Sequence, residues 1–146
     1  MFENIVDLIL GANFLPIGIV FTTVFIILAF KYYRYQKVVN ELNSYEKVKE
    51  KLESGEKVLV FIIDTFKCTS CMKVFFHIKS MLKKSGVEFL AIDSRTEQTF
   101  VKHYEVPALI VFQKGKQEKC FKPEINKSKT DLTQYQDFIT EVEKVW

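Results

Sequence analysis

The pattern of hydrophobic and polar residues divides the chain into an uncharged N-terminal stretch and a longer region in which both kinds alternate. No charged residue occurs from Leu8 to Phe30, and residues 14–30 read FLPIGIVFTTVFIILAF. A helix needs about 20 mostly apolar residues to cross the ~30 Å hydrocarbon layer of a bilayer, where it satisfies its own backbone hydrogen bonds. The run therefore predicts one transmembrane helix within an N-terminal segment of residues 1–35.

Residues on either side of this run distinguish an uncleaved anchor from a signal peptide. A cleavable signal has a basic N-terminal region, a shorter apolar run and a cleavage site of small residues. Here Glu3 and Asp7 precede the run, and no A-x-A-like site follows it. The residues that do follow are aromatic and cationic, as the membrane–water boundary favours: Lys31, Tyr32, Tyr33, Arg34, Tyr35 and Lys37. We expect an uncleaved anchor; the alternative is a buried helix of a soluble core.

Apolar side chains recur at helical spacing after the anchor. They are Val38, Leu42, Tyr45, Val48 and Leu52. This spacing places them on one face of a helix, which Ser54 and Gly55 would end. We expect a helical stalk over residues 36–44 that either continues from the span or breaks near residues 40–44. The apolar face is expected to pack on the sheet that follows, and dimerisation through it is the alternative.

Strand and helix patterns alternate over the remaining residues, 45–146. Short β-branched and aromatic runs predict strands at 57–64, 87–93, 107–112 and 117–122, and a turn containing Gly115 joins the last two. Amphipathic stretches predict helices at 68–84, 97–104 and 131–146. The last helix would turn these side chains inward: Leu132, Tyr135, Phe138, Ile139, Val142 and Trp146. This order predicts an α/β domain with a mainly parallel sheet, covered by helices on both faces and finished by an antiparallel hairpin.

Charge and cysteine content narrow the classes of function. The net charge is only +3 and no basic stripe is present, so nucleic acid is not an expected partner. Three cysteines are too few, and an odd number, for the disulfide framework of a secreted domain. Two of them form a C-x-x-C pair, Cys68 and Cys71, and Cys120 stands alone. That pattern suits redox chemistry or a metal site better than a structural framework.

The C-x-x-C pair follows the first predicted strand and opens the first long helix. Unpaired N–H groups and the helix macrodipole favour an anion at that position, which lowers the pKa of the Cys68 thiol. Its thiolate is the nucleophile of disulfide exchange, and Lys67 and Lys73 add positive charge nearby. Cys71 is close enough to resolve a mixed disulfide. The placement therefore indicates a redox-active pair.

Two other interpretations of the pair remain open. The cysteines could form half of a zinc site, or they could be inert residues of the core. Zinc requires two further nitrogen or sulfur ligands. The candidates are Cys120, His77 and His103, and no two of them have ligand spacing.

Two segments, VFIIDTFKCTSC and YEVPALIVFQKGK, followed by an amphipathic helix, resemble the thioredoxin family. The resemblance covers residues 45–146 and implies a thioredoxin-like α/β fold, a mixed central sheet flanked by helices. It implies that Cys68 and Cys71 are catalytic and that Pro107 is a cis-proline beside them. It also implies that Val106 and Pro107 hold the partner's chain in extended form. This chemistry requires no metal or organic cofactor.

The sequence departs from the family at several positions near the cysteines. Lys67 stands where the family usually has Trp, and Thr69-Ser70 stands where it usually has Gly-Pro. Ile62 occupies the place of a common buried acid, and Asp64 lies two residues away. The family's first short strand is not evident either. These changes affect substrate range, redox potential and proton handling, but they leave both sulfurs in place.

The sequence as a whole predicts a membrane-anchored thiol–disulfide oxidoreductase. It would exchange disulfides with protein substrates and with a thiol reductant or oxidant partner. The alternative is a redox-inactive thioredoxin-like binding or assembly module tethered to a membrane complex. Lys31, Arg34 and Lys37 follow the span, and such residues stay on the cytoplasmic side, so we expect the redox domain in the cytoplasm. The alternative location is extracytoplasmic, where disulfides are made.

Overall fold

The computed structural model describes the backbone of residues 2–96, 98–124 and 130–146, and the side chains of these ranges from Gly18 onward. The chain divides into two units, Met1–Lys37 and Val38–Trp146. Helix α1 (Phe2–Val39) makes up the described part of the first unit and ends just inside the second.

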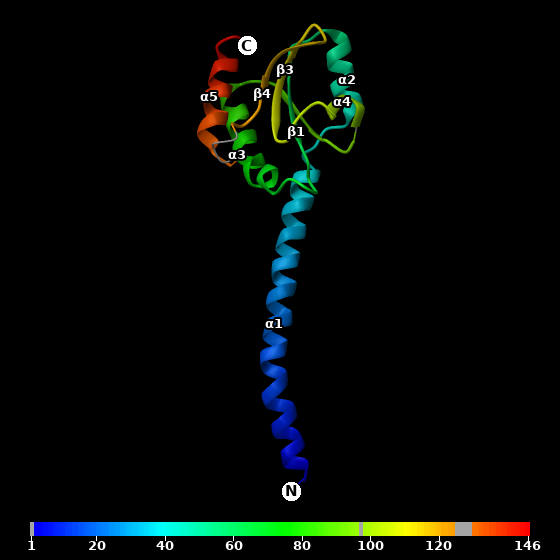
Figure 1. The fold of residues 1–146 in the computed structure, drawn as a ribbon, viewed down its shortest axis with the longest axis vertical. Coiled ribbons are helices and arrows are strands. Elements are labelled where there is room, and N and C mark those ends of the chain that lie inside the picture. Colours follow the sequence, from blue (N-terminus) through cyan, green and yellow to red (C-terminus); the bar gives the residue numbers. More distant parts are fainter. Residues whose placement is uncertain (1, 97, 125–129) are drawn as a thin grey trace. The chain divides into compact units, whose positions relative to one another are not determined.

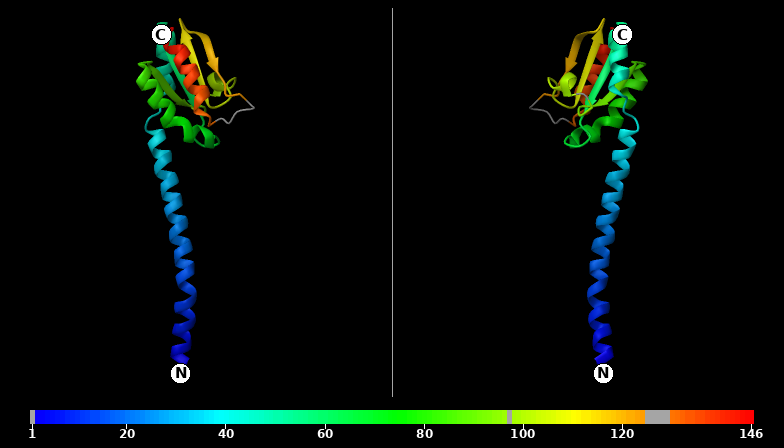
Figure 2. Two further views of the ribbon diagram at one scale, coloured as in Figure 1. Left: turned by 90° about the vertical axis from the view of Figure 1, so that its left-hand side faces the viewer. Right: turned by 90° about the vertical axis from the view of Figure 1, so that its right-hand side faces the viewer.

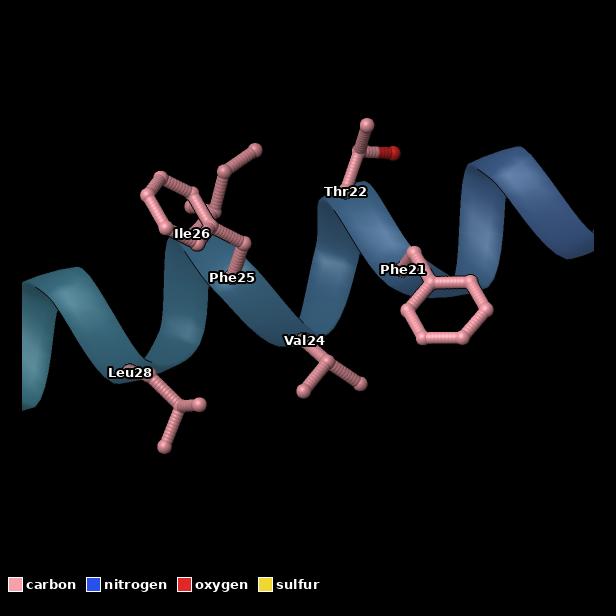
Figure 3. Close-up of a pocket in the computed structure, with 6 residues that line it drawn as sticks. All are labelled: Phe21, Thr22, Val24, Phe25, Ile26 and Leu28. Atoms are coloured by element: carbon pink, nitrogen blue, oxygen red, sulfur yellow. The ribbon is translucent and has the colours of Figure 1, made fainter.

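Helix α1 is largely apolar on all sides from Gly18 to Phe30. Every residue from Gly18 to Arg34 is exposed. Figure 3 shows side chains on opposite sides of the helix, with Phe21, Val24 and Leu28 on one side and Thr22 and Ile26 on the other. The hydroxyls of Thr22 and Thr23 donate to backbone carbonyls one turn earlier, at 2.9 and 2.8 Å, and so need no partner outside the helix. The segment Gly18–Val39, 22 residues with a mean hydropathy of 1.2, has the length and composition of a membrane span.

Within the described residues, four strands form one mixed sheet in the order β2-β1-β3-β4. They are β1 (Val58–Ile63), β2 (Phe89–Asp93), β3 (Ala108–Gln113) and β4 (Lys116–Phe121), and Figure 2 shows β4, in orange, at one edge. β1 pairs with β2 in parallel, whereas the pairs β1–β3 and β3–β4 are antiparallel. The mixed sheet that the family resemblance implies is confirmed, and the expectation of a mainly parallel sheet is wrong.

β3 runs opposite to β1 and β2, and the connection that precedes it contains a short helix. Helix α4 (Gln98–Val101) has four residues and therefore rises only about 6 Å. A strand of six residues such as β3 is about 20 Å long. A helix as short as α4 does not carry the chain back to the far end of the sheet. The strand pairings show that the chain enters β3 at the end where it leaves β2.

Two pairs of helices cover the two faces of the sheet (Figure 1). Helices α3 (Thr69–Ser85) and α5 (Leu132–Glu143) lie on one face, and α2 (Tyr45–Ser54) and α4 lie on the other. Alternate β1 side chains enter the two cores: Leu59, Phe61 and Ile63 face α3 and α5, and Val58, Val60 and Ile62 face α2 and α4. Burial on both faces explains why the β1 sequence is continuously apolar.

The stripe of apolar residues after the anchor does not form one helix. Helix α1 ends at Val39 and α2 begins at Tyr45, so the chain has the break that was one of the two alternatives. Val38 and Leu42 belong to the core under α3 and α5. The later members of the stripe belong to the core on the opposite face, as Val48 does with 0% exposure. Packing on the sheet is confirmed, but the break sends the stripe to both of its faces.

Asn43, within this break, closes the outer edge of β2. Its backbone N–H donates to the carbonyl of Ala91 at 2.6 Å, and its side-chain Oδ1 accepts the Ala91 N–H at 3.0 Å. An unpaired edge residue would otherwise leave both groups open to another chain. In the part of the chain that the structure describes, no strand precedes β1. Asn43 therefore makes, at the single residue Ala91, the two hydrogen bonds that an additional edge strand would make.

The C-terminal residue is misplaced in the sequence prediction. Helix α5 buries Tyr135, Ile139 and Val142, as predicted. Trp146, expected to point inward, is 38% exposed, and its ring lies 5.7 Å from the Lys57 ammonium. The helix ends at Glu143. Trp146 therefore leaves the helical face that the periodicity assigned to it.

Candidate active site

Cys68 and Cys71 form a disulfide at the start of helix α3, with their Cα atoms 5.2 Å apart. Cys68 is the N-cap residue of the helix and is partly exposed, whereas Cys71 is fully buried. Because Cys71 is buried, Cys68 carries the sulfur that another molecule can reach. The helix start predicted at residue 68 is thereby confirmed.

Two hydrogen-bond donors face the Cys68 sulfur. The backbone N–H of Cys71 lies 3.0 Å from Cys68 Sγ, and the hydroxyl of Ser70 lies 3.3 Å from it. A disulfide sulfur carries no proton, so the Ser70 hydroxyl is the donor in this state. Donors of this kind stabilise negative charge more than they stabilise a neutral sulfur. The same arrangement is therefore suited to a Cys68 thiolate.

The segment before β3 comes close to the disulfide. The Val106–Pro107 peptide bond is cis, as the family resemblance implies. The carbonyl oxygen of Val106 lies 4.0 Å from Cys68 Sγ, and Pro107 is buried. The structure thus brings together Cys68 and Val106, two of the four residues assigned to the site, and joins Cys71 and Pro107 directly to them.

Asp64 organises the loop that leads from β1 to the disulfide. Its Oδ1 accepts the backbone N–H groups of Phe66 and Lys67, at 2.8 and 2.7 Å. β1 ends at Ile63, so Asp64 lies in the turn rather than in the strand. Both of these hydrogen bonds join the Asp64 carboxylate to the loop that leads to Cys68. This residue, which the sequence could only place near the cysteines, therefore acts on the shape of the loop.

A second carboxylate, Asp93, joins this loop to the end of β2. The guanidinium of Arg95 donates to both of its oxygens, from Nε at 3.1 Å and from a terminal nitrogen at 2.8 Å. The hydroxyl of Thr65 also donates to Asp93. Burial would raise the pKa of Asp93, but the hydrogen bonds from Arg95 and Thr65 outweigh it and hold the pKa below its usual range. The ionised carboxylate therefore links two loops beside the disulfide.

Sequence reasoning did not identify this network. The signal was the run Asp93-Ser94-Arg95 at the end of a buried strand, where polar side chains of parallel strands meet. Thr65 gives no signal of its own, because its partner lies 28 residues away. The contact depends on the parallel pairing of β1 with β2.

Cys120 lies in β4, opposite Ile110 of β3, and packs against the core on the α2 and α4 face. Burial raises the pKa of its thiol, and the positive charge of Lys122 partly opposes this. It is a free thiol that takes no part in the Cys68–Cys71 disulfide. Across the described residues, no group of three His, Cys, Asp or Glu side chains is arranged to hold a metal ion.

The fold and the site define a class of protein: an α/β domain with a C-x-x-C disulfide at a helix start, beside a cis-proline. No family model matches the sequence, and no curated protein matches it. Solved structures do match. A thioredoxin from Malassezia sympodialis superposes with a TM-score of 0.56 at 17% identity, over 70% of this chain and 90% of that one.

Two further thioredoxins give similar values. Thioredoxin from Trypanosoma brucei brucei has a TM-score of 0.54 at 12% identity, over 69% of this chain and 87% of its own. The oxidised form of mitochondrial thioredoxin 3 from Saccharomyces cerevisiae has a TM-score of 0.53 at 13% identity, over 68% and 92%. At these identities the likeness shows the fold. The chain therefore has a thioredoxin-like α/β fold that carries a C-x-x-C pair.

Proposed function

We propose that this protein is a membrane-anchored thiol–disulfide oxidoreductase that acts on protein thiols and disulfides. The observation that carries the proposal is the position of Cys68. Its sulfur caps the first turn of α3, accepts hydrogen bonds from the Cys71 N–H and the Ser70 hydroxyl, and is bonded to a buried second sulfur. A helix start with these donors favours a thiolate and so a nucleophile.

The reaction proceeds by two exchanges. The Cys68 thiolate attacks one sulfur of the partner's disulfide, and the partner's other sulfur leaves as a thiolate. Cys71, once deprotonated, attacks Cys68 Sγ and releases the partner's remaining sulfur. The partner gains two electrons and two protons overall, and Cys68 and Cys71 end as the disulfide. A thiol reductant returns the pair to its reduced form, or an oxidant partner drives the sequence in reverse.

Val106 and Pro107 are proposed to bind the partner's chain. Support comes from the Val106 carbonyl, 4.0 Å from the sulfur that forms the mixed disulfide. A chain attached to that sulfur must pass the backbone of this segment. An extended partner chain there would find hydrogen-bonding backbone groups, as a strand edge offers.

The test uses variants in a Cys120→Ala background, so that the third thiol cannot contribute. Cys71→Ala is expected to accumulate mixed disulfides with partner proteins, visible as reducible high-mass species on non-reducing gels. Cys68→Ala should accumulate none, because the attacking sulfur is gone. Equal trapping by both variants would refute the assigned roles. Trapping by neither would favour the redox-inactive binding module.

The anchor is proposed to be α1, with the redox domain in the cytoplasm. Support comes from the exposed apolar surface of its described part and from Lys31, Arg34 and Lys37 after the span. A reducing cytoplasm would keep Cys68 and Cys71 mainly as thiols, so the protein would act chiefly as a reductase. Labelling intact cells with a membrane-impermeant lysine reagent tests the orientation. Labelling of the C-terminal unit before permeabilisation would assign it to the outside, and release of the chain into a soluble fraction would identify α1 as a signal sequence.

A further inference from the structure

Phe66 is the most exposed large apolar side chain among the described residues, at 77%. It lies two residues before Cys68. Outside α1, the other exposed large apolar side chains of the described residues are Val145 and Trp146, at the C-terminus. A phenylalanine kept in water beside a reactive sulfur indicates a contact surface, because large aromatic rings are the residues that interfaces use as anchors.

The structure holds this ring in place. The backbone N–H of Phe66 donates to the Asp64 carboxylate at 2.8 Å. The guanidinium of Arg95 lies 5.8 Å from the ring centroid, within the range of a cation–π contact. Arg95 is itself fixed by the carboxylate of Asp93 and by Thr65, which are 5% and 6% exposed. A ring that is fixed before binding loses little conformational entropy when a partner covers it.

The geometry of the site also determines what meets this ring. Disulfide exchange brings the partner's sulfur into bonding contact with Cys68 Sγ. Two residues of extended chain span at most about 7 Å, so the surface around the partner's disulfide also meets Phe66. Arg95 occupies one side of the ring. The ring is nevertheless 77% exposed, so most of its apolar surface is open to contact with a partner.

We propose that Phe66, supported by Arg95, is the docking point for an apolar side chain next to the reactive disulfide of a protein substrate. The inference rests on the proposed function and names its substrate class. Protein disulfides flanked by apolar residues bind this surface. Small disulfides that reach Cys68 alone do not use it.

The experiment compares three disulfides with the full chain in lipid nanodiscs: a peptide disulfide flanked by Leu, the same peptide flanked by Ser, and hydroxyethyl disulfide. Phe66→Ala is expected to lower kcat/KM for the Leu peptide about tenfold, mainly through KM. Its rates with the Ser peptide and with hydroxyethyl disulfide should stay at the wild-type value. Phe66→Leu keeps an apolar surface and should restore most of the Leu-peptide rate.

Trp146→Ala is the matched control. Trp146 is also an exposed ring that contacts a cation, Lys57. Lys57 precedes strand β1, whereas Cys68 follows the same strand, so the two lie at opposite ends of β1. The docking proposal is overturned if Phe66→Ala slows all three disulfides equally, if it slows none, or if Trp146→Ala has the same selective effect. A wild-type chain that reduces none of the three would refute the proposed function itself. The two failures are therefore distinguishable.

Discussion

The two ends of the parallel strands β1 and β2 use charged residues in different ways. At the amino end, Lys51 pairs with Glu88 at 3.4 Å and Lys57 pairs with Glu118 at 3.8 Å, and both carboxylates are exposed. At the carboxyl end, the carboxylate of Asp93 is buried and binds Arg95. The same two strands therefore end in surface ion pairs on one side and in a network around a buried carboxylate on the other.

This difference follows from what each end must position. Exposed ion pairs contribute little to stability because water and salt screen them. A buried carboxylate with several donors fixes the groups that surround it, because an unmade bond there costs more than it does in water. Among the described residues, these pairs contact none of the residues assigned to the site. At the carboxyl end the network fixes the loop that carries Phe66, Lys67 and Cys68.

The largest expected effect comes from breaking the carboxyl-end network. Asp93→Asn removes the charge that receives three hydrogen bonds from Arg95, two of them from its guanidinium, and one from Thr65. We expect the free energy of unfolding to fall by about 2 kcal/mol. Glu88→Gln, at the amino end, should cost at most about 0.5 kcal/mol. Thermal unfolding of the full chain, followed by circular dichroism, measures both. Equal costs would show that the two ends do not differ.

The pH dependence of unfolding in the wild type and in Asp93→Asn sharpens this test. The pKa of Asp93 in the folded protein lies below its usual range, so the unfolded chain binds the proton more readily. The stability that Asp93 contributes is therefore complete above the unfolded pKa of about 3.9 and is lost as the pH falls through the folded pKa. The gap in unfolding temperature between wild type and Asp93→Asn should narrow below about pH 4. A gap that stays constant into stronger acid would show that the ionised carboxylate is not its cause.

Local elements were the most predictable part of the fold. The β1 strand, the start of α3 at Cys68 and the positive-φ glycine Gly86 that ends α3 follow from patterns within a few residues. The break after Val39 was less predictable, because the apolar stripe continues across it at helical spacing. Within that break, Asn43 bonds to Ala91, 48 residues away. Periodicity reports that a side chain is buried, but not which face of the sheet buries it.

The candidate site divides in the same way. Cys68, Cys71 and Pro107 could be located from spacing and from the family resemblance, and the structure brings their segments together. Phe66 and Arg95 could not, since their contact requires β1 and β2 to be parallel neighbours. Nothing in the sequence around Phe66 distinguishes an exposed ring from a buried one. The residues that carry the chemistry could therefore be predicted from local sequence, whereas the surface around them could not.

The smallest expected effect concerns Ser70, the polar side chain at the carboxyl end that contacts sulfur. Its hydroxyl lies 3.3 Å from Cys68 Sγ. In the reduced protein it would donate to the thiolate, so Ser70→Ala should raise the pKa of the Cys68 thiol and lower the thiolate population about fivefold at pH values below that pKa. The thiolate's ultraviolet absorbance against pH measures the change.

Ser70→Thr keeps a hydroxyl and should behave as wild type, and Thr69→Ala, at the exposed neighbour, is the control. If Thr69→Ala shifts the titration as far as Ser70→Ala does, the effect belongs to the helix start as a whole. The backbone N–H of Cys71, 3.0 Å from the sulfur, remains in every variant and sets the part of the shift that no side-chain substitution removes.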